Sequence, residues 1–415
     1  MADYARGDGG GNPPYHPVLL TKSLRYASGA GVVSSRASAA RTSTAVAFGV
    51  LTADQHPDCR TISACRARPL PVLGDLFAPV VRLAGRLGLA RLVHVAQDGA
   101  QVLAHAAKHR AMGDGRMRQA AGRLGRAIQA LLAAARAAAV AADAAHGPAR
   151  AGDEGPPDLA GELARRERRL ATIRAAKAAL AAAGEPQQAG KVPDPQDAPA
   201  AKAPRNCTAP AARIMPHAAK AYVQAYNGQR AVDAGGDQRS VGCLLTNQRA
   251  APAHLPPLLA QVRAVTGRVP GAWSADAGYC SAANIAAVEA AGSTPYIPPH
   301  RQAHAAQLPP AVARRLATAG LGPPPAAATD ENAVQAAMRA RLQTEAGRRA
   351  YGRRKQPVEL VFGQLKERRG LRRFLLRGLA KVGAEWTLWC LTHNLLKLVR
   401  ALRRRPALRL LLAPR

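Results

Sequence analysis

The chain has few acidic residues, no paired-cysteine motif and no long uninterrupted apolar segment. Its 415 residues include 59 Lys and Arg but only 26 Asp and Glu, which gives a formal net charge of +33. The six cysteines form no CxxC pair, so the sequence indicates neither a zinc ribbon nor a disulfide framework. A reducing, cytoplasmic location is therefore expected.

Arginines interrupt the alanine- and leucine-rich runs, for example at Arg126 and Arg136. No stretch of about 20 apolar residues is left that could span a bilayer. The first residues, MADYARGDGGGNPP, also lack the apolar core of a signal peptide. The sequence therefore predicts a soluble protein with no membrane partner.

Two nucleotide-binding signatures are missing as well. The chain contains no GxxxxGK phosphate loop and no dinucleotide fingerprint of the GxGxxG type. We therefore expect no nucleotide cofactor and no reaction driven by ATP.

Positive charge is concentrated toward the end of the chain. Residues 351–415 contain 17 Lys and Arg against three acids, Glu359, Glu367 and Glu385. Coding bias toward G and C could also enrich arginine, but charge gathered in one region is more typical of a binding face. A polyanion is the expected partner, and nucleic acid is the first candidate.

Composition and hydrophobic periodicity divide the chain into five segments. Residues 1–90 have apolar residues at helical spacing and predict an all-helical N-terminal domain that could bind DNA. Residues 91–115 begin an α/β core, which 206–400 continue. Residues 116–205 predict a helical hairpin followed by a proline-rich linker, and 401–415 form a basic tail.

Strands alternating with helices in the core predict an α/β fold. The first strand, RLVHVAQDG, is expected to run from Arg91 to Gly99 and to stop at a turn directly after Asp98. Further strands are expected at 222–233 and 240–246, in a short segment ending at Asp276, and at TPYIPP. Helices are expected over LPPLLAQV and from Ser281 to Gly292.

Three acids, far apart in the sequence, could form a metal site. Asp98 and Asp276 each end a predicted strand, and Glu359 lies on a basic helix among Tyr351, Arg354, Lys355 and Lys366. Hydrolysis or transfer of a phosphodiester suits two divalent cations, one activating the attacking oxygen and one stabilising the leaving oxygen. Such cations prefer oxygen ligands. The alternative for Glu359 is a solvated salt bridge with its basic neighbours.

Other candidate residues carry weaker signals. Asp233 also ends a strand and is the main rival of Asp98 as a metal ligand. His105 and His109 lie one helical turn apart, but no glutamate follows the first histidine as a metalloprotease helix would require. Cys280 and Ser281 have no recognisable histidine partner for nucleophilic catalysis.

Five motifs resemble those of the DDE transposases of bacterial insertion sequences, of the group five and group eleven-eighty-two type. They are QDG at Asp98, YNGQRAVD at Tyr226–Asp233, SADAGYCS around Asp276, YGRRKQPVELVFGQLK around Glu359, and CLTHNLLKL from Cys390. The resemblance extends through nearly the whole chain, including YHPVLLTKSLRYASGAGVVSSR near its start. The motif around the last acid is the most specific.

The resemblance implies an RNase H-like catalytic core, a mixed sheet flanked by helices, interrupted by an α-helical hairpin insertion and preceded by an all-helical N-terminal domain. It implies that Asp98, Asp276 and Glu359 bind Mg²⁺ or Mn²⁺, with two ions expected. The expected partners are the inverted-repeat ends of the element and target DNA, bound by a homodimer associated with the nucleoid. The expected DNA-binding residues are Tyr351, Arg354, Lys355 and Lys366.

The chain departs from the family pattern at three positions. Alanine stands at Ala100, Ala209 and Ala251, where relatives usually carry threonine or aspartate. These losses favour an alternative reading, a catalytically decayed remnant that binds DNA. A basic nucleic-acid-binding protein with no metal site is a further alternative.

Overall fold

The computed structural model divides the chain into two compact units. The larger unit takes its residues from 1–102, 227–376 and 380–415, and the smaller from 103–226 and 377–379. Each unit has a hydrophobic cluster of its own. The structure describes residues 15–67, 71–107, 110–146, 159–181, 204–216, 222–235, 237–248, 252–299 and 333–412.

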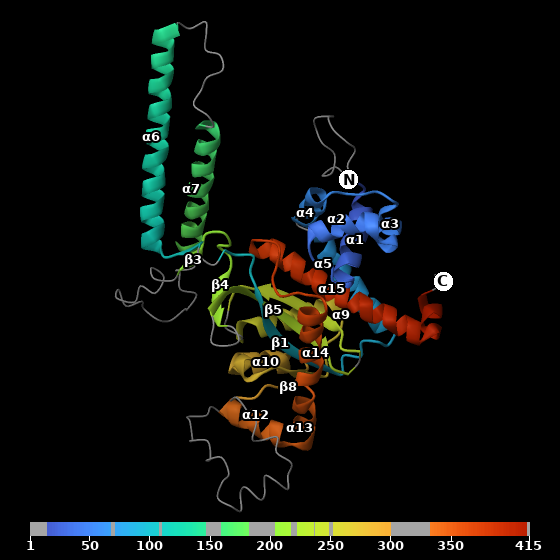
Figure 1. Ribbon diagram of the computed structural model, residues 1–415. Coiled ribbons are helices and arrows are strands. Elements are labelled where there is room, and N and C mark those ends of the chain that lie inside the picture. Colours follow the sequence, from blue (N-terminus) through green and yellow to red (C-terminus); the bar gives the residue numbers. More distant parts are fainter. Residues whose placement is uncertain are drawn as a thin grey trace, which may run out of the picture. The chain divides into compact units, whose positions relative to one another are not determined.

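A mixed β-sheet forms the core of the larger unit (Figure 1). Its strand order is β4-β5-β1-β7-β8, where β4 is Arg213–Pro216, and β6 also pairs with β5. β1, β7 and β8 are parallel, and β5 pairs antiparallel with β4 and β6. This arrangement, flanked by helices, is compatible with an RNase H-like core and confirms the predicted α/β class. The strands are β1 (His94–Leu103), β5 (Tyr222–Asp233), β6 (Ser240–Thr246), β7 (Ala272–Ser274) and β8 (Thr294–Tyr296).

Helices cover both faces of this sheet. On one face, helix α9 lies so close to β6 that a Cβ at Gly242 would be 2.8 Å from Val262. On the opposite face, helix α15 lies against β5, where a Cβ at Gly228 would be 2.9 Å from the Trp386 ring. The flanking helices of the core are α9 (Leu255–Thr266), α10 (Ala282–Ala290), α12 (Ala333–Gln343), α13 (Glu345–Gly352), α14 (Lys355–Gly363) and α15 (Leu379–Arg404).

The first core strand is longer than the sequence predicted. β1 does not stop at Gly99 but continues to Leu103, so the prediction that Asp98 ends a strand was wrong. Ala100 and Val102 are buried and continue the alternation of a strand past the Asp98-Gly99 dipeptide. Gly99 lies where a neighbouring side chain approaches the strand closely. The sequence alone does not distinguish such a strand glycine from a glycine in a turn.

Several other elements lie where the sequence predicted them. β5 and β6 have the predicted bounds, and α9 covers the predicted apolar repeat. Helix α10 begins after Ser281, whose hydroxyl accepts a hydrogen bond from the Asn284 backbone N–H at 3.1 Å. Serine is a favoured residue at this capping position because it pairs with an N–H that has no partner inside the helix.

Five helices precede β1 in the described part of the chain, and they lie in the larger unit. Leu87 and Ala90, which follow the last of them, pack against Leu398 and Ala401 of α15. The helices are α1 (Pro17–Gly29), α2 (Ser35–Thr44), α3 (Val46–Thr52), α4 (Cys59–Ala67) and α5 (Pro71–Arg86). The helical character of this region agrees with its sequence, whereas its limits as a separate domain stay a prediction.

The smaller unit contains two long helices that lie side by side (Figure 1). Met117, near the start of the first helix, is buried with Ile173, late in the second, and Arg166 donates to the Ala127 carbonyl at 3.2 Å. Residues early in one helix therefore meet residues late in the other, as in an antiparallel pair. The described elements are α6 (Asp114–His146), α7 (Leu159–Ala181), β2 (Ala111–Met112), β3 (Arg205–Asn206) and β4 (Arg213–Pro216).

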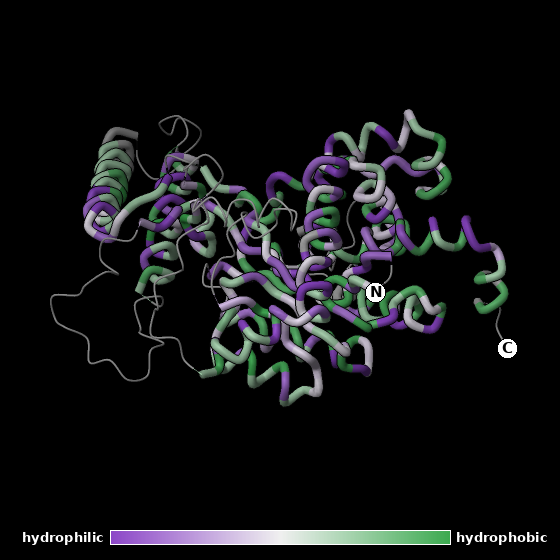
Figure 2. Tube along the Cα trace, turned by 90° about the horizontal axis from the view of Figure 1, so that it is seen from below, coloured by the Kyte–Doolittle hydropathy of each residue, from purple (hydrophilic) through white to green (hydrophobic). Residues whose placement is uncertain are grey.

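Hydrophilic and hydrophobic residues are interspersed along the helices (Figure 2). In the part of the chain that the structure describes, no helix combines the length and the apolar character needed to cross a membrane.

Candidate active site on the central sheet

Asp98 and Asp276 come from neighbouring parallel strands. Asp98 lies within β1, and Asp276 follows β7 and caps the short helical turn η6 (Ala277–Tyr279). The two carboxylates are both half-buried. Each is oriented by a backbone N–H: Asp98 accepts from Gly99 at 2.8 Å and Asp276 from Gly278 at 3.0 Å.

Glu359 reaches the same region from α14. This helix is amphipathic: Val358 and Val361 are fully buried against the core, while Glu359 is exposed. A single helical turn thus fixes the helix to the sheet and leaves the carboxylate accessible.

The surroundings of Asp98 raise its pKa to about 6. Burial is the largest cause, Arg354 opposes the rise, and the negative charges of Asp276 and, least of all, Glu359 add to it. Like charges raise the pKa of a carboxyl only when they are close, because the repulsion falls with distance. The charges of Asp276 and Glu359 thus contribute to the environment of Asp98.

The chemistry of this donor set suits a divalent cation, because Mg²⁺ and Mn²⁺ prefer carboxylate oxygens. The side chains as they stand are not arranged as a complete coordination shell. Among the described residues, no group of three or more His, Cys, Asp and Glu side chains is placed to hold one ion. Joining the three acids on a common ion therefore requires a side-chain movement, which the exposed position of Glu359 allows.

Arg354 is the cation nearest to Asp98. Its Nη1 lies 3.8 Å from Asp98 Oδ2, and its guanidinium carbon lies 5.5 Å from the centre of the Tyr351 ring. The side chain is buried, and its Nε has no hydrogen-bond partner among the described residues. Tyr351 is half-buried and packs beside Met338 and Leu342, so its ring supports the guanidinium from the core side.

Lys366 is half-buried and lies close enough to Asp98 to respond to its charge. It lies on the π-helical turn η8 (Gln364–Arg368) that continues α14. Burial lowers the pKa of Lys366, and the negative charge of Asp98 opposes that shift. Lys355 begins α14, and its side chain lies outside the described part of the structure.

Asp233, the rival of Asp98, has a different environment. It is fully buried, and its carboxylate accepts hydrogen bonds from the backbone N–H groups of Arg91 at 2.7 Å and Gly235 at 3.1 Å. Ala234, the residue that follows β5, donates its backbone N–H to the His94 carbonyl at 2.8 Å, so Asp233 lies beside the start of β1. Its oxygens hold two loops in place.

The weaker candidates gain no support. Burial raises the pKa of the Cys280 thiol, which disfavours the reactive thiolate, and the Ser281 hydroxyl caps α10. His109 lies outside the described residues, so the His105–His109 pair cannot be assessed as a unit.

Sequence reasoning missed a contact between the two strands that carry the aspartates. The His94 Nε2 of β1 lies 2.8 Å from the Ser274 hydroxyl of β7, and both residues are buried. Burial and the positive charge of Arg353 lower the pKa of His94 to about 4, so the neutral ring bridges the strands. An alternating pattern places His94 on the same strand face as Asp98, but nothing in the sequence names its partner.

The mixed sheet and its flanking helices define an α/β protein. Residues 326–399 match the family model described as the transposase DDE domain. The match includes Tyr351, Glu359 and Lys366, and it supports a DDE transposase, a DNA-cutting enzyme. No curated protein and no solved structure gives a match.

Proposed function

We propose that the protein is a DDE transposase that binds the inverted-repeat ends of an insertion sequence of the group five or group eleven-eighty-two type and performs metal-dependent cleavage and strand transfer. One observation carries the proposal: Asp98 on β1 and Asp276 after β7 belong to neighbouring parallel strands, in which Ala96 pairs with Ser274, two residues before each aspartate. The family match over 326–399 supports the same reaction class.

In this proposal Asp98, Asp276 and Glu359 hold Mg²⁺ or Mn²⁺, and two ions are expected. When bound, such cations activate an attacking water or 3′-hydroxyl and stabilise the leaving oxygen. The chain itself would supply the negative charge of these three carboxylates at the surface of the sheet. A bound cation would stabilise the ionised form of Asp98 most, because this carboxylate is half-buried and has two other acids near it.

The basic residues around Glu359 would hold the DNA backbone. Arg354 has a planar guanidinium that can donate two hydrogen bonds to one phosphate, whereas Lys366 contributes a point charge. Lys355 and the Tyr351 hydroxyl complete the proposed DNA-binding set. Because Arg354 faces Asp98 at 3.8 Å, a phosphate held by Arg354 would lie next to the acids.

Strand-transfer assays with Asp276→Ala test the reaction. We expect the variant to lose cleavage and joining of end DNA in Mn²⁺ while binding end DNA with nearly unchanged affinity. Glu345→Ala, which removes an exposed acid on α13, is the matched control and should keep both activities. Joining by Asp276→Ala at the normal rate would contradict the assignment.

A catalytically decayed DNA-binding remnant is the second candidate, and the alanines at 100, 209 and 251 favour it. Ala100 and Ala209 are buried, and Ala251 lies outside the described residues. The unsubstituted protein decides between the candidates: Mn²⁺-dependent cleavage of end DNA supports the transposase, whereas sequence-specific binding without cleavage at any cation concentration supports the remnant.

The proposed enzyme acts as a homodimer on DNA, so that each copy processes one end. Sedimentation of the protein with a duplex carrying one inverted repeat should give a complex with two protein copies and two duplexes. A complex that contains a single copy at saturating protein would contradict the dimer.

A further inference from the structure

A buried amide on β5 contacts both of the elements that carry the aspartates. Gln229 is fully buried, and its Oε1 accepts a hydrogen bond from the Tyr279 hydroxyl at 2.5 Å and from the Gln97 amide at 3.4 Å. Its Nε2 donates to Asn227 Oδ1 at 3.0 Å. The amide thus joins β1, β5 and the turn after Asp276.

The network continues to β7. Trp273 Nε1 donates to Gln97 Oε1 at 3.1 Å, and both side chains are fully buried. Trp273 lies three residues before Asp276 and Tyr279 three residues after it. The segment that carries Asp276 is therefore tied at both ends to the same pair of glutamines.

Because residue 99 is a glycine, the network can approach the Asp98 backbone from the face of β1 opposite to the Asp98 side chain. A Cβ at residue 99 would overlap the Gln229 amide nitrogen and would lie 2.8 Å from Asn227 Oδ1. Successive strand residues point to opposite faces, so Gln229 lies against the face of β1 opposite to Asp98. The position of the Asp98 backbone is thus defined from one side by Gln229.

Breaking such a network is costly, because each buried polar group that loses its partner also lacks water. Removal of the Gln229 amide would leave the hydroxyl of Tyr279 and the amide of Gln97 without one partner each. The segments that carry the two aspartates would then be able to shift relative to one another.

We propose that Gln229 is a positioning residue that sets the spacing between Asp98 and Asp276 through Tyr279 and Gln97. The inference rests on the proposed function, since the spacing matters for cation binding. Residues that orient metal ligands through hydrogen bonds commonly change cation affinity or activity by about 10–100-fold when they are replaced.

The test compares full-length Gln229→Met, Tyr279→Phe and the double variant. Methionine keeps the length of the side chain and removes both polar atoms. We expect Gln229→Met to weaken Mn²⁺ affinity, measured by electron paramagnetic resonance, by about tenfold. The Mn²⁺ concentration that half-saturates cleavage should rise by the same factor, and affinity for end DNA should stay unchanged.

The double variant shows whether the two residues act together. If Gln229 works through Tyr279, the double variant is no worse than the more affected single variant, because residues that share one interaction are not additive. Additive losses would overturn the pathway through Tyr279.

Val241→Ala is the structural control. Val241 is fully buried on β6, and its apolar side chain takes no part in the hydrogen bonds of the network, so its substitution should lower Tm without altering Mn²⁺ affinity. If Gln229→Met lowers Tm in the same way and leaves Mn²⁺ affinity unchanged, Gln229 has only a structural role and the proposal is overturned.

The outcomes separate this inference from the proposed function. An unsubstituted protein that neither binds Mn²⁺ nor cleaves end DNA removes the proposed function and, with it, the role of Gln229. If the unsubstituted protein binds Mn²⁺ and cleaves end DNA, and Gln229→Met does both equally well, only the role of Gln229 is ruled out.

Discussion

At the residue scale, the environment of Asp98 disfavours the ionised form of its carboxyl group. Its pKa is about 6 in the folded protein, against an ordinary value of 3.8. The folded state therefore favours the protonated carboxyl, and ionisation above pH 6 costs stability. The cost is absent below about pH 4, grows between pH 4 and pH 6, and reaches at most about 3 kcal/mol above that.

Asp98→Asn should therefore stabilise the protein when no cation is present. We expect the free energy of unfolding to rise by about 1–3 kcal/mol at pH 8, with the gain fading as the pH falls to 4. Urea denaturation in EDTA across this pH range measures the effect. A loss of stability at pH 8, or a gain that does not change with pH, would count against the Asp98 environment described above.

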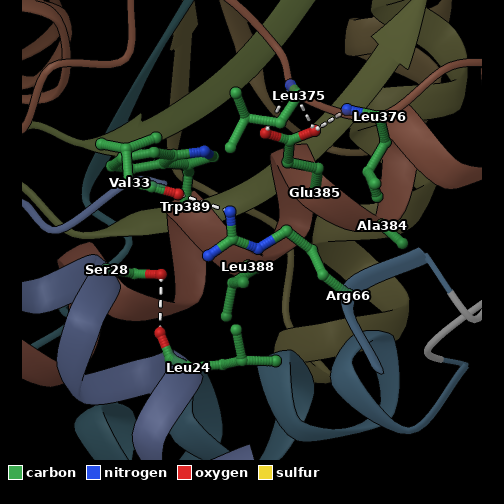
Figure 3. A pocket seen from close by; sticks show the side chains of 10 residues that line it. All are labelled: Leu24, Ser28, Val33, Arg66, Leu375, Leu376, Ala384, Glu385, Leu388 and Trp389. Atoms are coloured by element: carbon green, nitrogen blue, oxygen red, sulfur yellow. Dashed lines mark hydrogen bonds between the residues drawn. The ribbon is translucent and has the colours of Figure 1, made fainter. Parts of the chain in front are cut away.

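Glu385 of α15 is a buried carboxylate that accepts hydrogen bonds from the loop before this helix (Figure 3). Its oxygens accept hydrogen bonds from the backbone N–H groups of Leu375 at 3.1 Å and Leu376 at 3.0 Å. Burial raises the pKa of Glu385, and the charge of Arg66 opposes the rise. Arg66, from α4, donates to the Val33 carbonyl, so this cluster connects the loop, α15 and the N-terminal helices.

Glu385→Ala should lower the free energy of unfolding by about 2–4 kcal/mol, because two partly buried N–H groups lose their acceptor. Lys381→Ala, an exposed change on the same helix, should lie within about 0.5 kcal/mol of the unsubstituted protein. Chemical denaturation of both variants compares them directly. Equal stability of the two would mean that the carboxylate does not hold the loop.

At the element scale, the contact of β5 with α15 depends on a missing side chain. A Cβ at Gly228 would lie 2.9 Å from Trp386, whose ring stacks on Phe362 of α14 at 6.2 Å. Added volume at residue 228 would therefore displace the helices that carry Glu359 and cover the sheet.

We expect Gly228→Ala to destabilise the protein by about 1–3 kcal/mol, the usual cost of overpacking. Gly383→Ala is the control: it lies on α15 with nothing within 4 Å of a new Cβ, so the substitution should be neutral or stabilising by about 0.5–1 kcal/mol. Shifts of the denaturation midpoint measure both. Identical shifts would show that β5 and α15 are not in close contact.

Local patterns predicted much of this element structure. β5, β6, α9 and α10 follow from periodicity, turn residues and the capping signal at Ser281. The end of β1 was missed because an Asp-Gly pair has the same composition in a turn and in a strand that another side chain approaches closely. Packing of a distant residue, Gln229, decides between the two.

The candidate site was only partly predictable for the same reason. The residue types around Glu359 indicate phosphate chemistry, but sequence spacing cannot say whether Asp98 and Asp276 lie near it. That neighbourhood depends on the order of strands in the sheet. The His94–Ser274 contact and the Gln229 network also join residues more than one element apart, so no local pattern reveals them.

At the scale of the whole molecule, positive charge determines how the protein meets DNA. A net charge of +33 implies that binding releases many counterions. Affinity for duplex DNA without the element's ends should fall by on the order of 10³-fold or more between 50 and 200 mM salt. Fluorescence anisotropy measures this; a response that hardly depends on salt would argue against a broad DNA-binding face.

The most direct test of the central claim is to locate Mn²⁺ by anomalous diffraction in crystals of the protein bound to end DNA. We expect Mn²⁺ within coordinating distance of Asp98 and Asp276, with the Glu359 carboxylate moved to join the same site. Crystals in which saturating Mn²⁺ leaves these three carboxylates without an ion, or binds only elsewhere, would contradict the account.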